Sequence, residues 1–234
     1  KGWLDDTVLV CIFCGLLLYI VLYKMERSHP HPLIDMTLFR IRGFVFGQIA
    51  GVCATISLAA MTFVFPWYWQ GLRGLSAQEA GILILPLPLT LMILSPISGK
   101  LSDRFGPRGV ASAGLILLML GEWAISGMDL DMAYLDVIWR IVLFGAGLGL
   151  FLAPNNNAIM SSVSAHRRGV AAGLLGLFRY TGQSIGVAFS GVLFHIFSGQ
   201  ANFPDGSALS PQDAELFMQG MQGGFENLMG KVPT

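Results

Sequence analysis

Charged residues are scarce in this chain: Asp, Glu, Lys and Arg make up 12% of its 234 residues, about half of the roughly 25% usual in soluble domains. Acids and bases balance to a net charge of zero, which excludes the strongly basic surface that a nucleic-acid partner favours. Hydrophobic residues fill 54% of the chain, and several apolar runs reach the roughly 18 to 20 residues that cross a bilayer as a helix. The composition therefore predicts a membrane protein.

Cysteine and histidine are also few, and their spacing provides no catalytic or metal site. Cys11, Cys14 and Cys53 lie in apolar runs, so the C-x-x-C of the first two lacks the polar context of a redox or metal motif. We interpret them as small packing residues. No metal-ligand spacing, Ser-His-Asp set or phosphate-binding loop is present. The sequence therefore predicts no enzyme, no metal and no cofactor.

Six apolar segments are candidate membrane helices. They cover residues 7–23, 43–69, 78–98, 109–127, 135–160 and 169–197. Helices are favoured over strands because the bilayer core has no water to satisfy open backbone groups, and these runs lack the alternation of barrel strands. The predicted fold class is all-α, a polytopic transmembrane bundle of about six helices.

Basic residues gather in alternate connections between these segments. The connections after the first, third and fifth segments hold Lys24, Arg27, Arg40, Arg42, Lys100, Arg104, Arg108, Arg167 and Arg168. Loops rich in Lys and Arg tend to stay in the cytoplasm. We therefore expect a multi-pass protein of the inner or plasma membrane, with these connections on its cytoplasmic side.

The stretch GKLSDRFGPRG, residues 99–109, concentrates charge between two apolar runs. Its pattern G-x-L-x-D-R-x-G-x-R consists of Gly99, Leu101, Asp103, Arg104, Gly106 and Arg108. One interpretation is a short cytoplasmic turn held inside by its bases. The other is a conformational latch, because an acid just before a helix interacts favourably with the positive end of the helix dipole and can pair with the neighbouring arginines.

This loop resembles the cytoplasmic signature loop of the major facilitator superfamily, in the copy found in the second half of those transporters. Pro107 stands where the family usually has a basic residue. Four further stretches within residues 32–197 resemble the fourteen-helix drug:proton antiporter subfamily: HPLIDMTLFRIRGF, YWQGLRGLSAQEAGILILP, GLGLFLAPNNNAIMSSV and RRGVAAGLLGLFRYTGQSIGVA. The resemblance implies multidrug efflux by alternating access, powered by the proton gradient, with the loop as a latch.

The same resemblance implies that the chain is the C-terminal half of a transporter. Residues 1–23 would be an extra central helix, 24–42 a cytoplasmic interfacial linker, 43–197 five helices of that half, and 198–234 an extracytoplasmic loop with the truncated start of a last helix. The expected partners are membrane lipid, an amphipathic small-molecule substrate and an N-terminal transporter half. The alternative is a non-transporting membrane module that packs with a partner transporter and modulates it.

Arg179 is the residue of the predicted helices whose transfer into the bilayer core costs the most free energy. It lies about ten residues into the last segment, roughly 15 Å along the helix and near the bilayer midplane. A central arginine must face protein or a wet cavity. Gln183 follows one turn later, so the pair is a candidate for the transport path. Alternatively, Arg179 bonds carbonyl groups that Pro86 and Pro88 free in a neighbouring helix.

Glu122 and Arg140 are the other charges inside the predicted spans. Both lie one to two turns from the same outer connection, so an ion pair between adjacent helices is expected. The alternative is that Glu122 takes up and releases protons during transport. Asn155 and Asn156 follow Pro154, and either cap a kinked helix end or touch substrate.

Small residues recur in the last two segments, where they let helices approach closely and slide. The predicted packing and hinge positions are Pro86, Pro154, Gly145, Gly147, Gly149, Gly182 and Gly186. Trp67, Tyr68 and Trp69 end the second segment, where aromatic rings favour the membrane interface. We therefore expect these three rings at the outer membrane surface.

Overall fold

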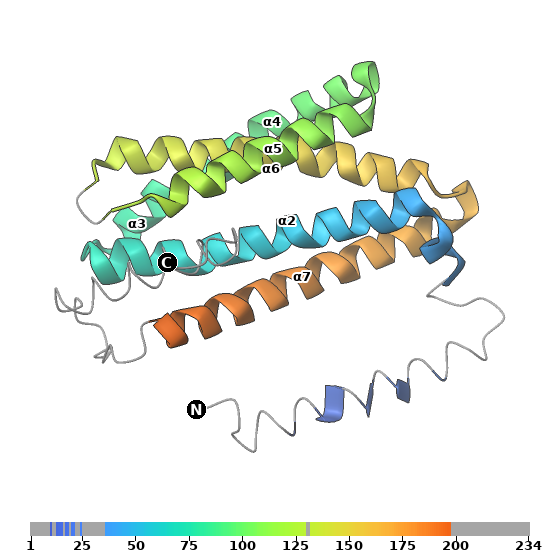
Figure 1. The fold of residues 1–234 in the computed structure, drawn as a ribbon, viewed down its shortest axis with the longest axis horizontal. Coiled ribbons are helices and arrows are strands. Elements are labelled where there is room, and N and C mark those ends of the chain that lie inside the picture. The colour runs from blue at the N-terminus through green and yellow to red at the C-terminus, as the bar shows by residue number, and fades with distance from the viewer. Residues whose placement is uncertain are drawn as a thin grey trace, which may run out of the picture.

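The apolar segments fold into long helices joined by short connections (Figure 1). The computed structural model describes residues 36–129 and 132–197, together with separate positions between 10 and 24. Its helices are α2 (Arg42–Pro66), α3 (Ala77–Ile84), α4 (Pro86–Phe105), α5 (Pro107–Ser126), α6 (Tyr134–Ser161) and α7 (Arg168–Phe197), with the short turns η1 (Met36–Arg40), η2 (Trp67–Leu72) and η3 (Ala165–Arg167). The all-α prediction is confirmed. The predicted first helix and the segment after residue 197 lie outside the described residues.

Within the described residues, four helical stretches are long and apolar enough to cross a membrane. They are Arg42–Leu72, Ala77–Phe105, Pro107–Ser126 and Tyr134–Ser161. Helix α7 has 30 residues, which is length enough, but it carries Arg179 and Gln183 near its middle and is not among the four. Five of the six predicted segments are therefore helical over a length that can span a membrane. The helix outside the four is α7, which contains the polar residues Arg179 and Gln183.

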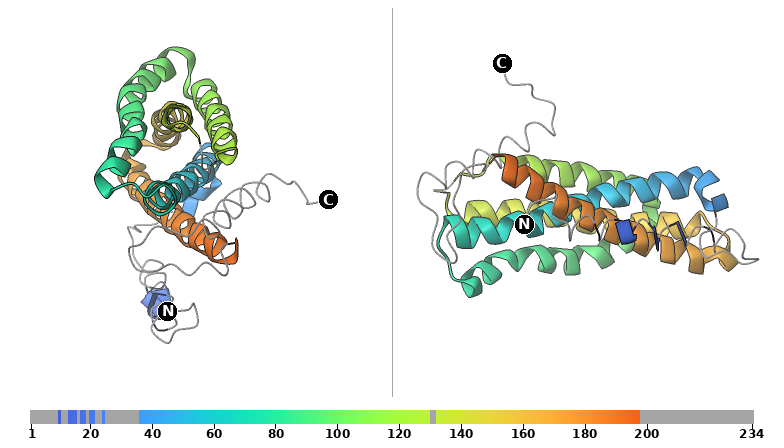
Figure 2. Two further views of the ribbon diagram at one scale, coloured as in Figure 1. Left: turned by 90° about the vertical axis from the view of Figure 1, so that its left-hand side faces the viewer. Right: turned by 90° about the horizontal axis from the view of Figure 1, so that it is seen from below.

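Helix α6 lies at the centre of the bundle. It packs most extensively against α5 and α4, and more lightly against α2, whereas α7 packs mainly against α2 (Figure 2). Phe144, Leu148 and Phe151 of α6 are buried in the larger core cluster. The described helices thus form two groups, a pair of α2 and α7 and a group of α4, α5 and α6.

The three base-bearing connections of the described chain lie at one end of the bundle. Figure 1 shows the start of α2, the α4–α5 connection and the α6–α7 connection together at that end. At the start of α2, η1 places Leu38 in a second core cluster with Phe44 and Ile159. The Arg167 side chain there donates a hydrogen bond to the Thr37 hydroxyl, 2.6 Å away. The helices therefore alternate in direction as the pattern of basic residues predicts.

Glycines bring the helix backbones into direct contact. A Cβ placed on Gly121 of α5 would lie 2.7 Å from the Phe144 Cα of α6, and one on Gly186 of α7 would lie 2.7 Å from the Ile56 carbonyl oxygen of α2. The predicted packing glycines also meet neighbouring helices: Gly145, Gly147, Gly149 and Gly182. Any larger side chain at these contacts would push the helices apart.

The predicted turn at residues 99–109 is almost entirely helical. Helix α4 continues to Phe105 and α5 begins at Pro107, so Gly106 alone connects them. Gly106 has φ 86°, which ends α4 in a conformation that L side chains avoid. Pro107 then suits the first position of α5 because that position needs no backbone N–H.

Prolines shape two helices differently. Pro86 begins α4 directly after the Leu85 junction with α3, so the predicted helix 78–98 is two helical pieces. The Thr90 hydroxyl donates to the Pro86 carbonyl oxygen at 2.7 Å. Pro154 lies inside α6, which continues to Ser161. The asparagines after Pro154 are therefore within a helix, and the prediction that they cap its end is wrong.

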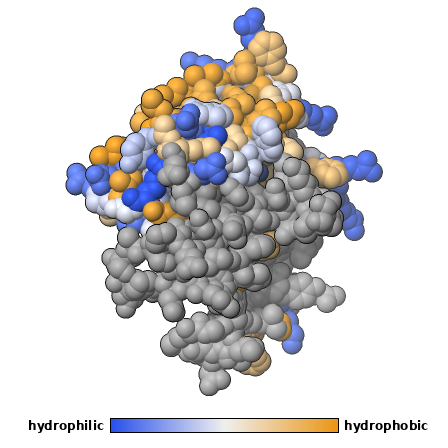
Figure 3. Space-filling model, turned by 60° about the vertical axis from the view of Figure 1, so that its left-hand side comes forward, coloured by the Kyte–Doolittle hydropathy of each residue, from blue (hydrophilic) through white to orange (hydrophobic). Residues whose placement is uncertain are grey.

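Large apolar side chains cover the outside of the bundle. Met92 of α4 is 68% exposed, Trp123 of α5 is 64% exposed and Leu135 of α6 is 77% exposed. In Figure 3, apolar residues reach the surface of the described region beside polar residues. Such a surface is stable against lipid tails rather than water.

Helix contact at Gly186 provides a test of the packing. Replacing Gly186 by Leu drives the new side chain into the α2 backbone, and overpacking of this kind costs about 1 to 3 kcal/mol. We expect a lower thermal unfolding midpoint for the detergent-purified protein. Gly176→Leu, in the same helix, is the matched control because nothing lies within 4 Å of its Cβ position. Equal midpoints for the two variants would contradict the α2–α7 packing.

Candidate functional site

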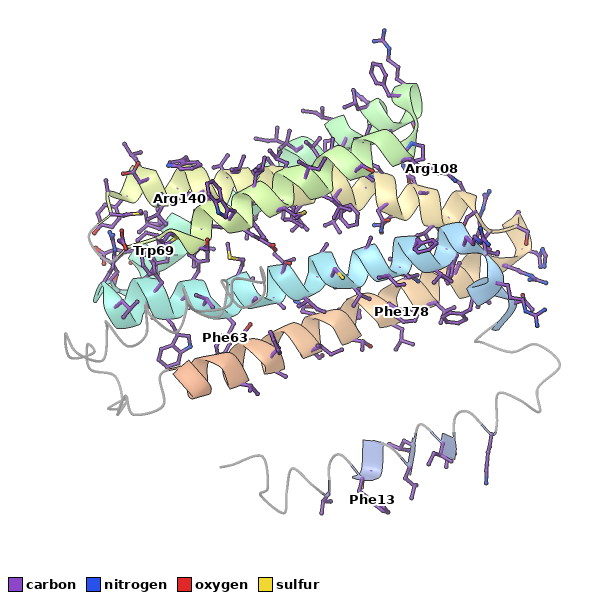
Figure 4. The ribbon with its side chains drawn as sticks, viewed as in Figure 1. Phe13, Phe63, Trp69, Arg108, Arg140 and Phe178 are labelled. Carbon is purple, nitrogen blue, oxygen red and sulfur yellow. The ribbon has the colours of Figure 1, made fainter. Side chains whose placement is uncertain are left out.

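A polar cleft lies where α2, α6 and α7 meet, in the half of the bundle near the basic connections. The cleft is narrow, with a cavity volume of about 20 Å³, and its polar lining comprises Gln48, Thr55, Asn155, Asn156 and Arg179. Leu152, Leu175 and Phe178 are among its apolar walls. Phe178, labelled in Figure 4, lies on α7 alongside α2. Polar groups of three helices thus converge inside a largely apolar bundle.

Close approach of α2 and α6 forms one wall of the cleft. Asn155 Nδ2 donates a hydrogen bond to the Gly47 carbonyl oxygen, 3.0 Å away. Gly47 and Gly51 have no side chain to hold α6 off, and a Cβ on Gly47 would lie 2.6 Å from the Ile159 side chain. The glycines therefore let a buried asparagine of α6 reach the backbone of α2.

Gln48 is a cleft residue that the sequence did not reveal. Its side chain is 6% exposed, and its Nε2 atom is buried without a hydrogen-bond partner in the described part of the chain. A buried amide without a partner costs about 1 to 3 kcal/mol. A glutamine in an apolar helix is a sequence signal, but only the packing of α2 shows which helices it faces.

Arg179 lines the cleft at its rim, and the residue is exposed. No ion pair to a carboxylate is present for it among residues 36–129 and 132–197, nor does it hydrogen-bond α4 there. The alternative of an arginine held by carbonyls near Pro86 is therefore wrong. Gln183 is exposed and is not part of the cleft lining, because Gly182 and Gly186 occupy the face of α7 that meets α2.

Glu122 and Arg140 do not form the expected ion pair in the described chain. The Glu122 carboxyl lies near the Ser57 side chain of α2 and interacts with it. Arg140 instead contacts the Met132 sulfur and stacks on Trp139, with its guanidinium carbon 5.1 Å from the ring centroid. Glu122 faces α2, whereas Arg140 faces the α5–α6 connection. Their similar depth along α5 and α6 therefore did not bring the two side chains together.

Aromatic rings and Arg73 close the other end of the bundle. Tyr68 is 1% exposed and Trp69 is fully buried, so both rings pack inside the protein at this end of the bundle, and their position at the membrane surface stays a prediction. The Arg73 guanidinium lies 5.3 Å from the Tyr68 and Tyr134 ring centroids and donates to the Met132 carbonyl. Tyr68 donates to the Asp129 carbonyl oxygen at 3.1 Å. These contacts tie the α2–α3 connection to the α5–α6 connection; Figure 4 shows Trp69 and Arg140 at this end.

The signature-loop residues lie at the opposite end, where Figure 4 labels Arg108. Asp103 is exposed in the last turn of α4, so it precedes α5 by a full turn. It makes no ion pair with Arg104 or Arg108 in the described structure, and the Arg104 guanidinium lies 5.4 Å from the Phe105 ring centroid. The remaining members of the motif are Gly99 and Leu101 in α4, and Gly106. The latch role stays a prediction.

The comparison with known sequences identifies the family. A profile of the Major Facilitator Superfamily matches residues 7–187, more than half of the chain. The chain therefore belongs to this superfamily. Its curated relatives include proteins named as transporters, which indicates a transporter rather than an enzyme.

Three relatives illustrate the similarity. The chain is 31% identical over 201 residues to the uncharacterized transporter YebQ of Escherichia coli, covering 84% of this chain and 44% of the relative. It is 30% identical over 189 residues to the riboflavin transporter RibZ of Clostridioides difficile, covering 81% and 41%. It is 30% identical over 205 residues to the tetracenomycin C resistance and export protein of Streptomyces glaucescens, covering 87% and 38%. The chain thus spans less than half the length of these curated relatives.

The Asn155 contact yields a second prediction. Asn155→Leu removes the hydrogen bond to the Gly47 carbonyl, which keeps only its partner within α2, at a cost of about 0.5 to 1.5 kcal/mol. The expected result is a lower thermal unfolding midpoint in detergent. Asn157→Leu is the matched control, since Asn157 is exposed in the same run of asparagines. An unchanged midpoint for Asn155→Leu would rule out a stabilising contact between α2 and α6 at this position.

Proposed function

We propose that this chain forms the C-terminal half of a transporter of the fourteen-helix drug:proton antiporter type, which exports amphipathic small molecules across the cell membrane. The observation that carries the proposal is the polar cleft between α2, α6 and α7 inside an apolar bundle. Membership of the superfamily supports it. The names of the relatives add support, since one is a riboflavin transporter and another exports tetracenomycin C.

The division into two helix groups supports alternating access. The α2–α7 pair meets the α4–α5–α6 group mainly through α2 and α6, and the cleft lies at that junction. A small rotation of one group against the other would change access to the cleft without unfolding either group. Close backbone contacts at glycines within each group, such as Gly186 against α2, would hold the helices of that group together during the movement.

Glu122 is a candidate for coupling this movement to protons. Its carboxyl on α5 lies near the Ser57 side chain on α2, so it faces the boundary between the two groups. Protonation exchanges an acceptor-only carboxylate for a group that also donates, and this changes the contact between the groups. The cytoplasmic motif around Asp103 would then act as the latch between conformations, with an N-terminal transporter half as its partner.

Reconstitution tests whether the chain is one half of a transporter. The chain is placed in proteoliposomes alone or together with its N-terminal half, a pH gradient is imposed, and export of a fluorescent amphipathic dye is followed. We expect export with both halves present, and its loss when a protonophore dissipates the gradient. Absence of export in both arrangements would contradict transport and favour the alternative of a membrane module that modulates a partner.

Arg179 tests the cleft as the transport path. Arg179→Ala removes the charge that lines the cleft, so dye export by the complete transporter should fall at least about tenfold, the loss expected for a charge-assisted contact of roughly 1.5 to 3 kcal/mol. Arg168→Ala, an exposed arginine at the start of the same helix, is the control. Both variants should insert in the membrane as the original does. Unchanged export by Arg179→Ala would remove Arg179 from the path.

A further inference from the structure

The cleft offers hydrogen-bond donors that lack acceptors. Gln48 Nε2 is buried with no partner in the described chain, and the Arg179 guanidinium can only donate. Thr55 donates to the Val52 carbonyl at 2.9 Å, Asn155 donates to Gly47, and Asn156 adds a further amide to the lining. Gln48 is the buried donor that a bound acceptor would satisfy, with Arg179 beside it.

Negative charge is absent from the walls of the cleft. Helices α2 and α7 contain no Asp or Glu, and α6 contains only Asp136 in its first turn, about five helical turns from Asn155. Glu122 lies near Ser57 and is not part of the lining. The positive charge of Arg179 is therefore not neutralised by the helices that form the cleft.

We propose that this cleft selects amphipathic substrates by an anionic or electron-rich acceptor, such as a carboxylate, a phenolate or a ring carbonyl, and disfavours lipophilic cations. The inference rests on the proposed function and names the substrate class of that same site. Gln48 and Arg179 bind the acceptor, and Phe178 with the aliphatic walls packs against the apolar part of the molecule.

The physical basis is the low polarity of the surroundings. Charge-assisted hydrogen bonds are about twice as strong as neutral ones, and charges interact more strongly away from bulk water. A cation placed beside Arg179 is repelled and leaves the Gln48 donor unpaired. A ligand that cannot hydrogen-bond the polar groups of such a site leaves them unpaired. This discriminates between ligands far more strongly than a small difference in ligand size does in an apolar pocket.

Two dyes of matched shape test the selectivity. Fluorescein and rhodamine 123 share a three-ring xanthene core, but the first is an anion at neutral pH and the second is a cation. Their binding to the complete transporter in lipid nanodiscs is measured by fluorescence anisotropy, which needs no proton gradient. We expect fluorescein to bind at least about tenfold more tightly, as the loss of one charge-assisted bond implies.

Substitutions assign the preference to the cleft. Arg179→Gln should weaken fluorescein binding at least about tenfold and leave rhodamine 123 binding equal or stronger, and Gln48→Leu should weaken fluorescein binding by about three- to tenfold. The matched controls are Arg168→Gln and Gln70→Leu, both exposed positions away from the cleft. Both controls should bind the two dyes as the original protein does.

The outcomes separate this inference from the proposed function. Preferential binding and export of rhodamine 123 would overturn the acceptor preference and leave the transport proposal intact. Fluorescein binding that depends on Arg179, without export of either dye, would support the site and contradict transport. Binding of neither dye, or fluorescein binding unaffected by Arg179→Gln, would overturn the inference.

Discussion

Helix backbones touch at glycines throughout this bundle, and the position of each polar side chain follows from those contacts. In a bilayer, lipid tails are as apolar as leucine, so helices associate through close packing and hydrogen bonds rather than through hydrophobic burial. Gly121 meets the backbone of α6 at Phe144, and Gly186 meets α2 at Ile56. With those distances set, α6 becomes the centre of one helix group and α2 with α7 forms the other.

The polar residues of the bundle concentrate where these two groups meet. Asn155 reaches the Gly47 carbonyl across α2 and α6, and Glu122 reaches Ser57 across α5 and α2. At the outer end, Tyr68 and Arg73 bind backbone carbonyls of the α5–α6 connection. Each contact satisfies a polar group that would be costly in lipid, and each joins elements whose relative movement would change access to the cleft.

Gln48 and Arg179 line the cleft, and Gln48 Nε2 is buried there without a partner in the described part of the chain. Polar groups inside a membrane are expensive and tend to mark pathways. The other buried donors without a partner among the described residues, Trp69 Nε1, Arg73 Nε and Arg140 Nε, belong to side chains that make ring contacts at the opposite end of the bundle, whereas Gln48 and Arg179 face a space bounded by three helices. The contrast separates side chains that hold the bundle together from those available to a bound molecule.

The sequence by itself determined the all-α class, the alternating helix directions, the glycine faces and the arginine in α7, because hydropathy, charge and small-residue spacing are local properties. Only the tertiary structure decided that Gln48 and Arg179 share a cleft, that Glu122 faces Ser57 instead of Arg140, and that Tyr68 and Trp69 are buried. Residues at the same depth in two helices meet only if each helix is rotated about its axis so that they face each other. That rotation is set by contacts between residues far apart in the chain.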